Sequence, residues 1–231
     1  MERISGTEEN CGMRSPAKIE YLYELCDVLA MRWPNNRTVN IVCHGHSVPA
    51  GYACTPWVDS FHAYPHAVHT RLKQMFPYAV INVIVTAIGG ENSAEGEKRF
   101  MKDVLAHSPS LITIDYGLND RGLGLPAAEK AWRSMIEMAL RQKVRVLLMT
   151  PSWDTSWFEK NESWRELEKH ACQIRRLSEE YRIGLGDSFQ AFERYIHSGG
   201  DLQDLLSHVN HPSPLGHQLI AREITSWFIP R

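Results

Sequence analysis

Residues 39–49 read VNIVCHGHSVP, a β-branched run that ends in a tight Gly-His-Ser turn. A short apolar run of this kind is typical of a strand buried on both faces of a sheet. Ser47 follows that run directly, where the turn would expose its hydroxyl. Taken alone, Ser47 would more often be a helix cap than a nucleophile. The segments that follow along the chain favour the nucleophile.

Four further β-rich runs are separated from one another by helical patterns. The runs are 80–86, 111–116, 144–150 and 183–186, after the first at 39–43. The helical patterns are 61–76, 93–107, 127–142, 162–181 and 214–229, and Ser15-Pro16 marks an earlier helix start. Alternation of this kind predicts an α/β fold with a five-stranded parallel sheet covered by helices on both faces. We expect residues 15–231 to form a single domain, preceded by a polar tail or arm over residues 1–14.

The composition is that of an ordinary globular protein, with 43% hydrophobic and 23% charged residues among 231. A net charge of −2 gives no basic footprint for nucleic acid, and no apolar run reaches the length of a membrane span. The five cysteines lack a C-x-x-C pair, which argues against a disulfide framework and fits a reducing compartment. The N-terminus lacks the pattern of a secretory signal, so we expect a cytoplasmic protein. The sequence leaves the oligomeric state open.

Three other short segments carry the residues of acyl-transfer chemistry. Gly89-Gly90 follows the second run, Asn119 ends the third, and His211 precedes the last helix. Because the carboxyl ends of parallel strands meet at one edge, we expect the glycines and Asn119 to converge there with Ser47, and the turn Asn210–Pro212 to hold His211 near that edge. A neutral His211 imidazole would take the proton of Ser47, which would attack an ester carbonyl. The side-chain amide of Asn119 and the backbone N–H of Gly90, or of Gly89, would stabilise the oxyanion.

In their order along the chain these segments resemble the motifs of the SGNH (GDSL-type) hydrolases, over roughly residues 38–229. The resemblance implies a flavodoxin-like, three-layer α/β/α fold and hydrolysis of esters or thioesters without a cofactor or metal. It also implies that Ser47 is the nucleophile and His211 the base. The oxyanion donors that it implies are the backbone N–H of Ser47 and Gly90 and the side chain of Asn119.

Two positions depart from the family pattern. His46 stands where the family has an aspartate before the serine, and His208 where it has an aspartate three residues before the histidine. The third member of a triad is therefore open. His211 would be oriented by a backbone carbonyl, which gives a Ser–His dyad, or by a nearby side chain. The candidate orienting side chains are Asp201, Asp204 and His208.

The literal Gly-Asp-Ser string of the chain lies elsewhere, at residues 186–188. It follows the fifth run, downstream of both Gly90 and Asn119, so it breaks the order of the family motifs. We therefore interpret Asp187 as a helix N-cap and reject Ser188 as the nucleophile.

The predicted substrate is a small carboxylic ester, a short acyl or acetyl group on a carbohydrate or a lipid. Candidate substrate-binding residues are His46 and Asp120 beside the motifs, and Trp153 and Trp157 after the fourth run. Alternatively, these aromatic rings seal a loop onto the body of the protein.

Two rival functions remain open. The substitutions at the two aspartate positions allow a catalytically silent carbohydrate-binding module on the same fold. A metal-dependent hydrolase is the other rival. Its ligands would come from His44, His46, His208, His211 and Asp120.

Overall fold

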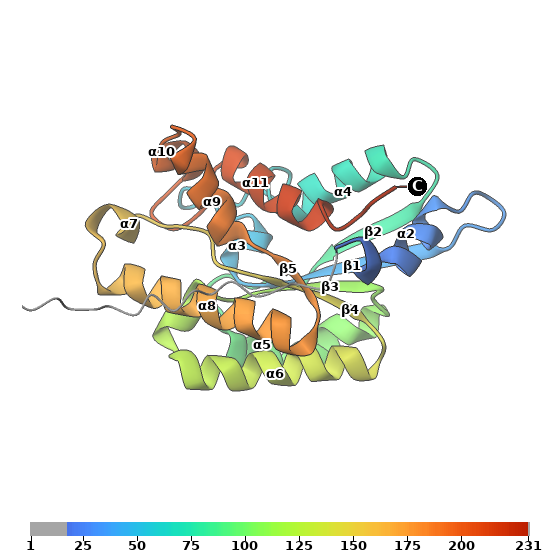
Figure 1. The fold of residues 1–231 in the computed structure, drawn as a ribbon, viewed down its shortest axis with the longest axis horizontal. Helices are drawn as coiled ribbons and strands as arrows, with labels where there is room; N and C mark the ends of the chain where they lie inside the picture. Colours follow the sequence, from blue (N-terminus) through green and yellow to red (C-terminus); the bar gives the residue numbers. More distant parts are fainter. Residues whose placement is uncertain (1–17, 231) are drawn as a thin grey trace, which may run out of the picture.

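The computed structural model describes residues 18–230 and is built on one five-stranded parallel sheet (Figure 1). The strands are β1 (Thr38–Gly45), β2 (Val80–Val85), β3 (Leu111–Asp115), β4 (Arg145–Met149) and β5 (Gly184–Gly186). Each lies within two residues of a predicted run, so the predicted α/β class and parallel sheet are confirmed. The tail predicted over residues 1–14 and the helix start at Ser15-Pro16 fall outside the described residues.

The strand order is β2-β1-β3-β4-β5, the flavodoxin-like order that the resemblance implied. Strand β1 pairs with β2 on one side and with β3 on the other. Val42 of β1 therefore lies beside both Ile84 of β2 and Ile112 of β3. The crevice beyond the carboxyl ends of β1 and β3 is where such sheets bind ligands. That crevice is where the chemistry-bearing segments after β1 and β3 begin.

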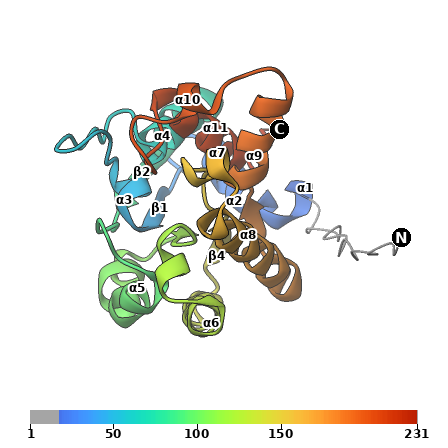
Figure 2. The same ribbon diagram turned by 90° about the vertical axis from the view of Figure 1, so that its left-hand side faces the viewer.

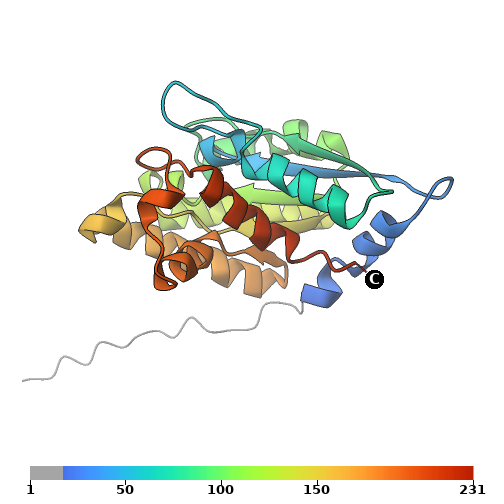
Figure 3. The ribbon, with the colours of Figure 1, turned by 90° about the horizontal axis from the view of Figure 1, so that it is seen from above.

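Helices cover both faces of the sheet. They are α1 (Lys18–Tyr21), α2 (Tyr23–Ala30), α3 (Ser47–Ala50), α4 (Tyr64–Met75), α5 (Ser93–Arg99), α6 (Leu125–Arg141), α7 (Ser156–Glu159), α8 (Glu162–Tyr181), α9 (Ser188–His197), α10 (Leu202–Leu205) and α11 (Pro214–Thr225). In Figures 1 and 2, α5, α6 and α8 lie on one face, and α4, α9 and α11 lie on the other. Seen from above in Figure 3, α4 and α11 lie side by side across that second face. This is the three-layer arrangement predicted for the chain.

Each face of the sheet has its own apolar core. Trp132 of α6 and Phe100 are fully buried on one face, and Trp227 and Phe192 on the other. In the helix predicted over 162–181, the apolar side chains from Trp164 to Leu177 are buried, as expected for an amphipathic helix. No helix among residues 18–230 is both long and apolar enough to cross a membrane.

Local sequence signals set the helix ends. Asn92 and Glu95 form the capping box of α5: the Asn92 side chain accepts from the Glu95 N–H at 3.2 Å, and the Glu95 carboxylate accepts from the Asn92 N–H at 3.0 Å. The α-helix ends at Arg99, and a π-turn (Phe100–Val104) and a 3₁₀ turn (η2, Leu105–His107) complete the predicted helical span. Asp187 caps α9 by accepting from the Gln190 N–H at 3.1 Å, as predicted.

Candidate active site

Ser47 is the first residue of α3, directly after the end of β1. Its side chain lies close to the sheet edge, and the residue is only 6% exposed. His46 caps this helix, because its Nδ1 accepts from the Val48 N–H at 3.2 Å. Pro49 has no N–H. Among the described residues none accepts from the Ser47 N–H, so this turn leaves one backbone donor free beside the hydroxyl.

His211 meets Ser47 across the sheet edge, with 3.0 Å between its Nε2 and the Ser47 Oγ. Its Nδ1 lies 3.0 Å from the backbone oxygen of Ala53. A carbonyl oxygen only accepts, so Nδ1 carries the proton and Nε2 presents its lone pair to the Ser47 hydroxyl. Burial lowers the pKa of His211 below its usual 6.5, and the Ala53 carbonyl partly offsets this effect. The imidazole is therefore held in the tautomer that a general base requires.

Of the two alternatives for orienting His211, the candidate carboxylates Asp201 and Asp204 are occupied elsewhere. Asp201 and Asp204 form the capping box of α10, where Asp204 accepts from the Asp201 N–H at 3.2 Å and from the Tyr195 hydroxyl at 2.9 Å. Local capping satisfies both side chains away from His211. His208 stacks on His211, with ring centroids 6.5 Å apart, and does not orient it by a hydrogen bond. The structure therefore presents a Ser–His pair backed by a backbone carbonyl.

The two adjacent glycines differ in what their backbone requires. A Cβ at Gly89 would lie 2.6 Å from the ring of Tyr52, so Gly89 makes room for that side chain. Gly90 has φ +85°, a left-handed conformation that favours glycine, and a Cβ there would meet nothing within 4 Å. Among the described residues none accepts from the Gly90 N–H. This geometry favours Gly90 over Gly89 as the donor to a ligand.

Asn119 opens a 3₁₀ turn after β3 (η3, Asn119–Gly122) and is tied to the glycine loop. Its Nδ2 donates to the Glu91 backbone oxygen at 2.8 Å, which uses one of its two amide hydrogens. The Glu91 carboxylate is itself fixed by Arg99 (Nε to Oε1, 2.9 Å) and by the Tyr116 hydroxyl (3.2 Å). The second Asn119 amide hydrogen has no acceptor among the described residues. The free N–H of Ser47 and the free amide hydrogen of Asn119 thus lie after the carboxyl ends of the neighbouring strands β1 and β3. Asn119 also holds the loop of Gly90 through the Glu91 carbonyl.

Asp120 and His46, both predicted to contact substrate, are instead buried structural residues. Asp120 is 0% exposed and accepts from the Ser93 N–H at 2.8 Å and from the Trp132 indole at 2.7 Å, so it joins η3 to α5 and α6. Burial raises its pKa. His46 is 1% exposed, with its Nε2 3.5 Å from an Asp115 carboxylate oxygen. Both positions are closed off from a ligand by the packing of the turns that carry them.

The two candidate tryptophans also pack inward, which corrects their assignment to substrate binding. Trp153 is 4% exposed and lies against Trp157, Trp164 and Phe189, with ring centroids 4.9–5.6 Å away. Trp157 stacks on Trp153 and is partly buried. The Lys160 ammonium lies 4.5 Å from the Trp157 ring centroid, a cation–π contact. These rings seal the segment after β4 onto α8 and α9, as the alternative interpretation held.

The histidines considered as ligands for a metal-dependent hydrolase do not form a ligand set. His44 is fully buried, with its Nδ1 3.0 Å from the Thr86 hydroxyl and its Nε2 3.1 Å from the Tyr116 hydroxyl. Burial lowers its pKa to about 3. In the part of the chain that the structure describes, no three His, Cys, Asp or Glu side chains are grouped as metal ligands would be.

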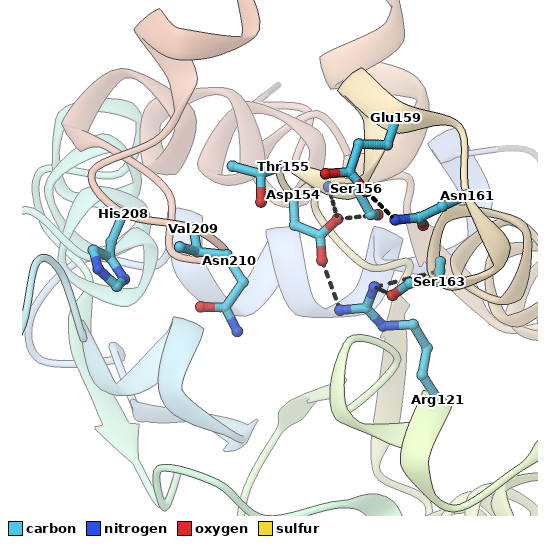
Figure 4. A pocket seen from close by; sticks show the side chains of 10 residues that line it. All are labelled: Arg121, Asp154, Thr155, Ser156, Glu159, Asn161, Ser163, His208, Val209 and Asn210. Carbon is cyan, nitrogen blue, oxygen red and sulfur yellow. Dashed lines mark hydrogen bonds and ion pairs between the residues drawn. The ribbon is translucent and has the colours of Figure 1, made fainter.

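A polar cleft of about 380 Å³ adjoins the site (Figure 4). Its lining comes from three segments: Arg121 of η3, residues 154–163 after β4, and residues 208–210, which lead into His211. Arg121 and Asp154 form an ion pair at 2.6 Å across its floor. Sequence reasoning missed this cleft, since its walls are far apart in the chain. Ala53 was missed for another reason: its backbone carbonyl has no residue signature.

Comparison with known proteins agrees with this architecture. The sequence model of the GDSL-like Lipase/Acylhydrolase family matches residues 43–219. An acetylxylan esterase from Geobacillus stearothermophilus is 25% identical over 163 residues, covering 65% of this chain and 74% of the relative.

Solved structures share the fold at lower identity. A catalytic mutant of an acetylxylan esterase from Geobacillus stearothermophilus superposes with a TM-score of 0.71 at 22% identity, covering 84% of this chain and 97% of that one. A two-domain esterase active on acetylated mannans gives 0.70 at 20% identity, covering 91% of this chain and 52% of that one. For the bacterial acetylxylan esterase, variants of a serine, of a histidine and of an aspartate three positions before that histidine are described as catalytic mutants.

Proposed function

Because this chain belongs to the GDSL-like lipase/acylhydrolase family and is thus a hydrolase of ester bonds, we propose that it is a serine esterase that removes acetyl groups from a carbohydrate. The observation that carries the proposal is the 3.0 Å contact between Ser47 Oγ and His211 Nε2, with His211 Nδ1 held by Ala53. A hydroxyl next to a correctly oriented imidazole is the arrangement that activates a serine.

In the proposed reaction, Ser47 Oγ attacks the ester carbonyl carbon while His211 Nε2 takes the hydroxyl proton. The oxyanion is stabilised by the backbone N–H of Ser47 and of Gly90 and by the Asn119 amide. His211 then gives its proton to the departing alkoxide, which leaves an acyl group on Ser47. Water, deprotonated by His211, attacks this acyl-enzyme, and His211 then gives the proton to Ser47 Oγ as the bond to the acyl group breaks and the carboxylic acid leaves.

The substrate class rests on two independent supports. The acetylxylan esterase relative and the mannan-active esterase are named for acetylated polysaccharides. The cleft beside the site is lined by charged, hydroxyl and amide side chains, with Val209 as the one aliphatic residue in its lining. Such a lining suits a polyhydroxylated alcohol better than a lipid chain.

The test is covalent labelling together with turnover. A fluorophosphonate should add to Ser47, as located by mass spectrometry of peptides, and the purified protein should hydrolyse p-nitrophenyl acetate. Ser47→Ala should abolish the labelling and lower kcat by about 10⁴-fold or more. Ser188→Ala is the matched control, because Ser188 is also a buried serine at the start of a helix, and it should leave both readouts unchanged.

Two outcomes would overturn the proposal. An active enzyme in which Ser47 stays unmodified would mean that another group is the nucleophile. A protein that binds acetylated xylan fragments but neither hydrolyses them nor reacts with the fluorophosphonate would instead be a silent binding module.

A further inference from the structure

The cleft beside the segment that leads into His211 takes no part in the proposed reaction steps (Figure 4). One wall is the segment 208–210, which runs directly into His211. The opposite wall holds Arg121, two residues after Asn119. A ligand in the cleft would therefore lie between the segment of the proposed base and the segment of the proposed oxyanion donor.

The proton transfers of the proposed reaction indicate which part of the ester lies on the His211 side of Ser47. His211 Nε2 must return its proton to the leaving oxygen, so the alcohol part of the ester extends on the His211 side of Ser47. The carbonyl oxygen of the ester, rather than its acyl chain, points to the oxyanion donors. The cleft adjoins the segment of His211, and it is therefore placed to hold the alcohol.

The side chains on the cleft floor are fixed before any ligand binds. Arg121 donates to the Leu118 oxygen at 3.0 Å, to the Ser163 backbone and hydroxyl oxygens at 3.3 and 2.7 Å, and to Asp154 at 2.6 Å. Asp154, whose side chain is 6% exposed, also accepts from the Ser156 N–H at 3.0 Å. The four bonds of Arg121 use four of its five N–H groups, which leaves one on Nη2 for a ligand.

Asn210 supplies a polar group with nothing to bind in the structure. Its side chain lies between His208 and the Arg121–Asp154 pair in Figure 4. Among the described residues none makes a hydrogen bond to its amide, which offers two donors and one acceptor. A partly buried amide of this kind gains most from a ligand that has both hydroxyl donors and acceptors.

We propose that this cleft binds the alcohol part of the substrate as a sugar ring. In this arrangement the Asn210 amide hydrogen-bonds one ring hydroxyl, and the Arg121–Asp154 pair offers a donor and an acceptor to another. Asn210 and the ion pair are thus specificity-determining residues. The inference rests on the proposed function, because it assigns the two sides of an ester that Ser47 attacks.

The test compares two acetate esters with different alcohols. One is a methyl β-D-xylopyranoside carrying a single acetyl group, and the other is hexyl acetate, which has no hydroxyl. The ratio of kcat/KM for the sugar ester to that for hexyl acetate should fall at least tenfold in Asn210→Ala. The double variant Arg121→Gln/Asp154→Asn should lower the same ratio without leaving a buried charge unpaired. Asn36→Ala, which removes a partly exposed amide in the loop before β1, is the matched control and should leave the ratio unchanged.

The outcomes separate this inference from the proposed function. A wild-type protein that hydrolyses hexyl acetate, together with variants whose ratio stays within twofold of wild type, would overturn the sugar site alone. A wild-type protein that hydrolyses neither ester would overturn the proposed function and the sugar site with it. Fluorophosphonate labelling of Asn210→Ala at the wild-type rate would show that His211 keeps its place, so a fall in the ratio reports the cleft.

Discussion

Ser47 lies between two imidazoles that have the same chemistry and different surroundings. His211 Nε2 is 3.0 Å from the hydroxyl, and His46 Nδ1 is 3.4 Å from it. The His211 ring is half-buried and hydrogen-bonded to the Ala53 carbonyl, whereas the His46 ring is buried, with its Nε2 3.5 Å from the Asp115 carboxylate and without a hydrogen bond among the described residues. Proximity to Ser47 alone would not tell which of the two is the base.

The second contact of each ring favours His211 as the proposed base. When His211 gains a proton at Nε2, its Nδ1–H keeps the bond to Ala53. When His46 gains a proton at Nδ1, it loses the Val48 N–H that this atom accepts at 3.2 Å, because both groups would then be donors. A base must gain its proton without breaking the structure that holds it. His211 meets that condition, and His46 serves as the cap of the helix that carries Ser47.

Removing the imidazole of His211 should produce the largest effect. His211→Ala is expected to lower kcat for p-nitrophenyl acetate by about 10⁴-fold, because Ser47 loses its proton acceptor. The melting temperature should change little, since His211 is only half-buried and makes one backbone contact outside the site. Steady-state kinetics and thermal unfolding measure the two quantities. A loss of kcat of similar size in His46→Asn would show that His46 takes part in the reaction and is not only the cap of α3.

The predictable part of this site came from local signals. Continuous apolar runs identified the strands, the rule that ligands bind beyond their carboxyl ends brought Ser47 and Asn119 to one edge, and the Asn-His-Pro turn before the last helix indicated His211. Asp201 is a common N-cap residue type, but the third position after it holds Asp204 where the capping-box signal has Glu or Gln, so the sequence signalled only part of the cap that occupies these carboxylates.

Other features depend on contacts between distant segments and carry no local signal. The support of His211 by the Ala53 carbonyl joins residues 158 positions apart through a backbone atom. The burial of Trp153 depends on Trp164 and Phe189, which reach it from two other helices. From the sequence, His46 is predicted to be a polar turn residue. Only the pairing of β1 with β3 brings the Asp115 carboxylate close to its ring. Tertiary packing decides such cases.

Removing the imidazole of His46 should act mainly on stability. His46→Ala is expected to lower the free energy of unfolding by about 2 kcal/mol, since it removes a helix cap and leaves the buried Asp115 carboxylate without its imidazole neighbour. For a chain of this length that corresponds to a fall of about 4–8 °C in melting temperature. Calorimetry measures it. A change below about 0.5 kcal/mol would show that neither contact contributes to the fold.

A milder substitution separates the two contacts of His46. In the His46→Asn variant the side-chain amide oxygen can accept from the Val48 N–H, so the cap is kept while the group facing Asp115 is lost. The expected loss of stability is about 1 kcal/mol, roughly half that of His46→Ala. Denaturant unfolding of both variants under one set of conditions gives the comparison. Equal losses would mean that the cap contributes nothing and that the Asp115 contact accounts for the whole effect.

The pH dependence of kcat/KM should be the smallest of these effects, and it reports the ionisation of His211 most directly. Only the neutral imidazole accepts the Ser47 proton, so kcat/KM should fall as the pH drops through the pKa of His211 in the free enzyme. Burial lowers that pKa, and the midpoint of the acid limb is therefore expected below 6.5. His217 is also buried, with its pKa lowered to about 3, so unfolding takes up protons and stability declines below pH 6.5. Circular dichroism at each pH measures the folded fraction, so that a loss of stability is distinguished from titration of His211. A midpoint above 6.5 would require a carboxylate close to His211, and it would restore the triad that the contacts of Asp201 and Asp204 exclude.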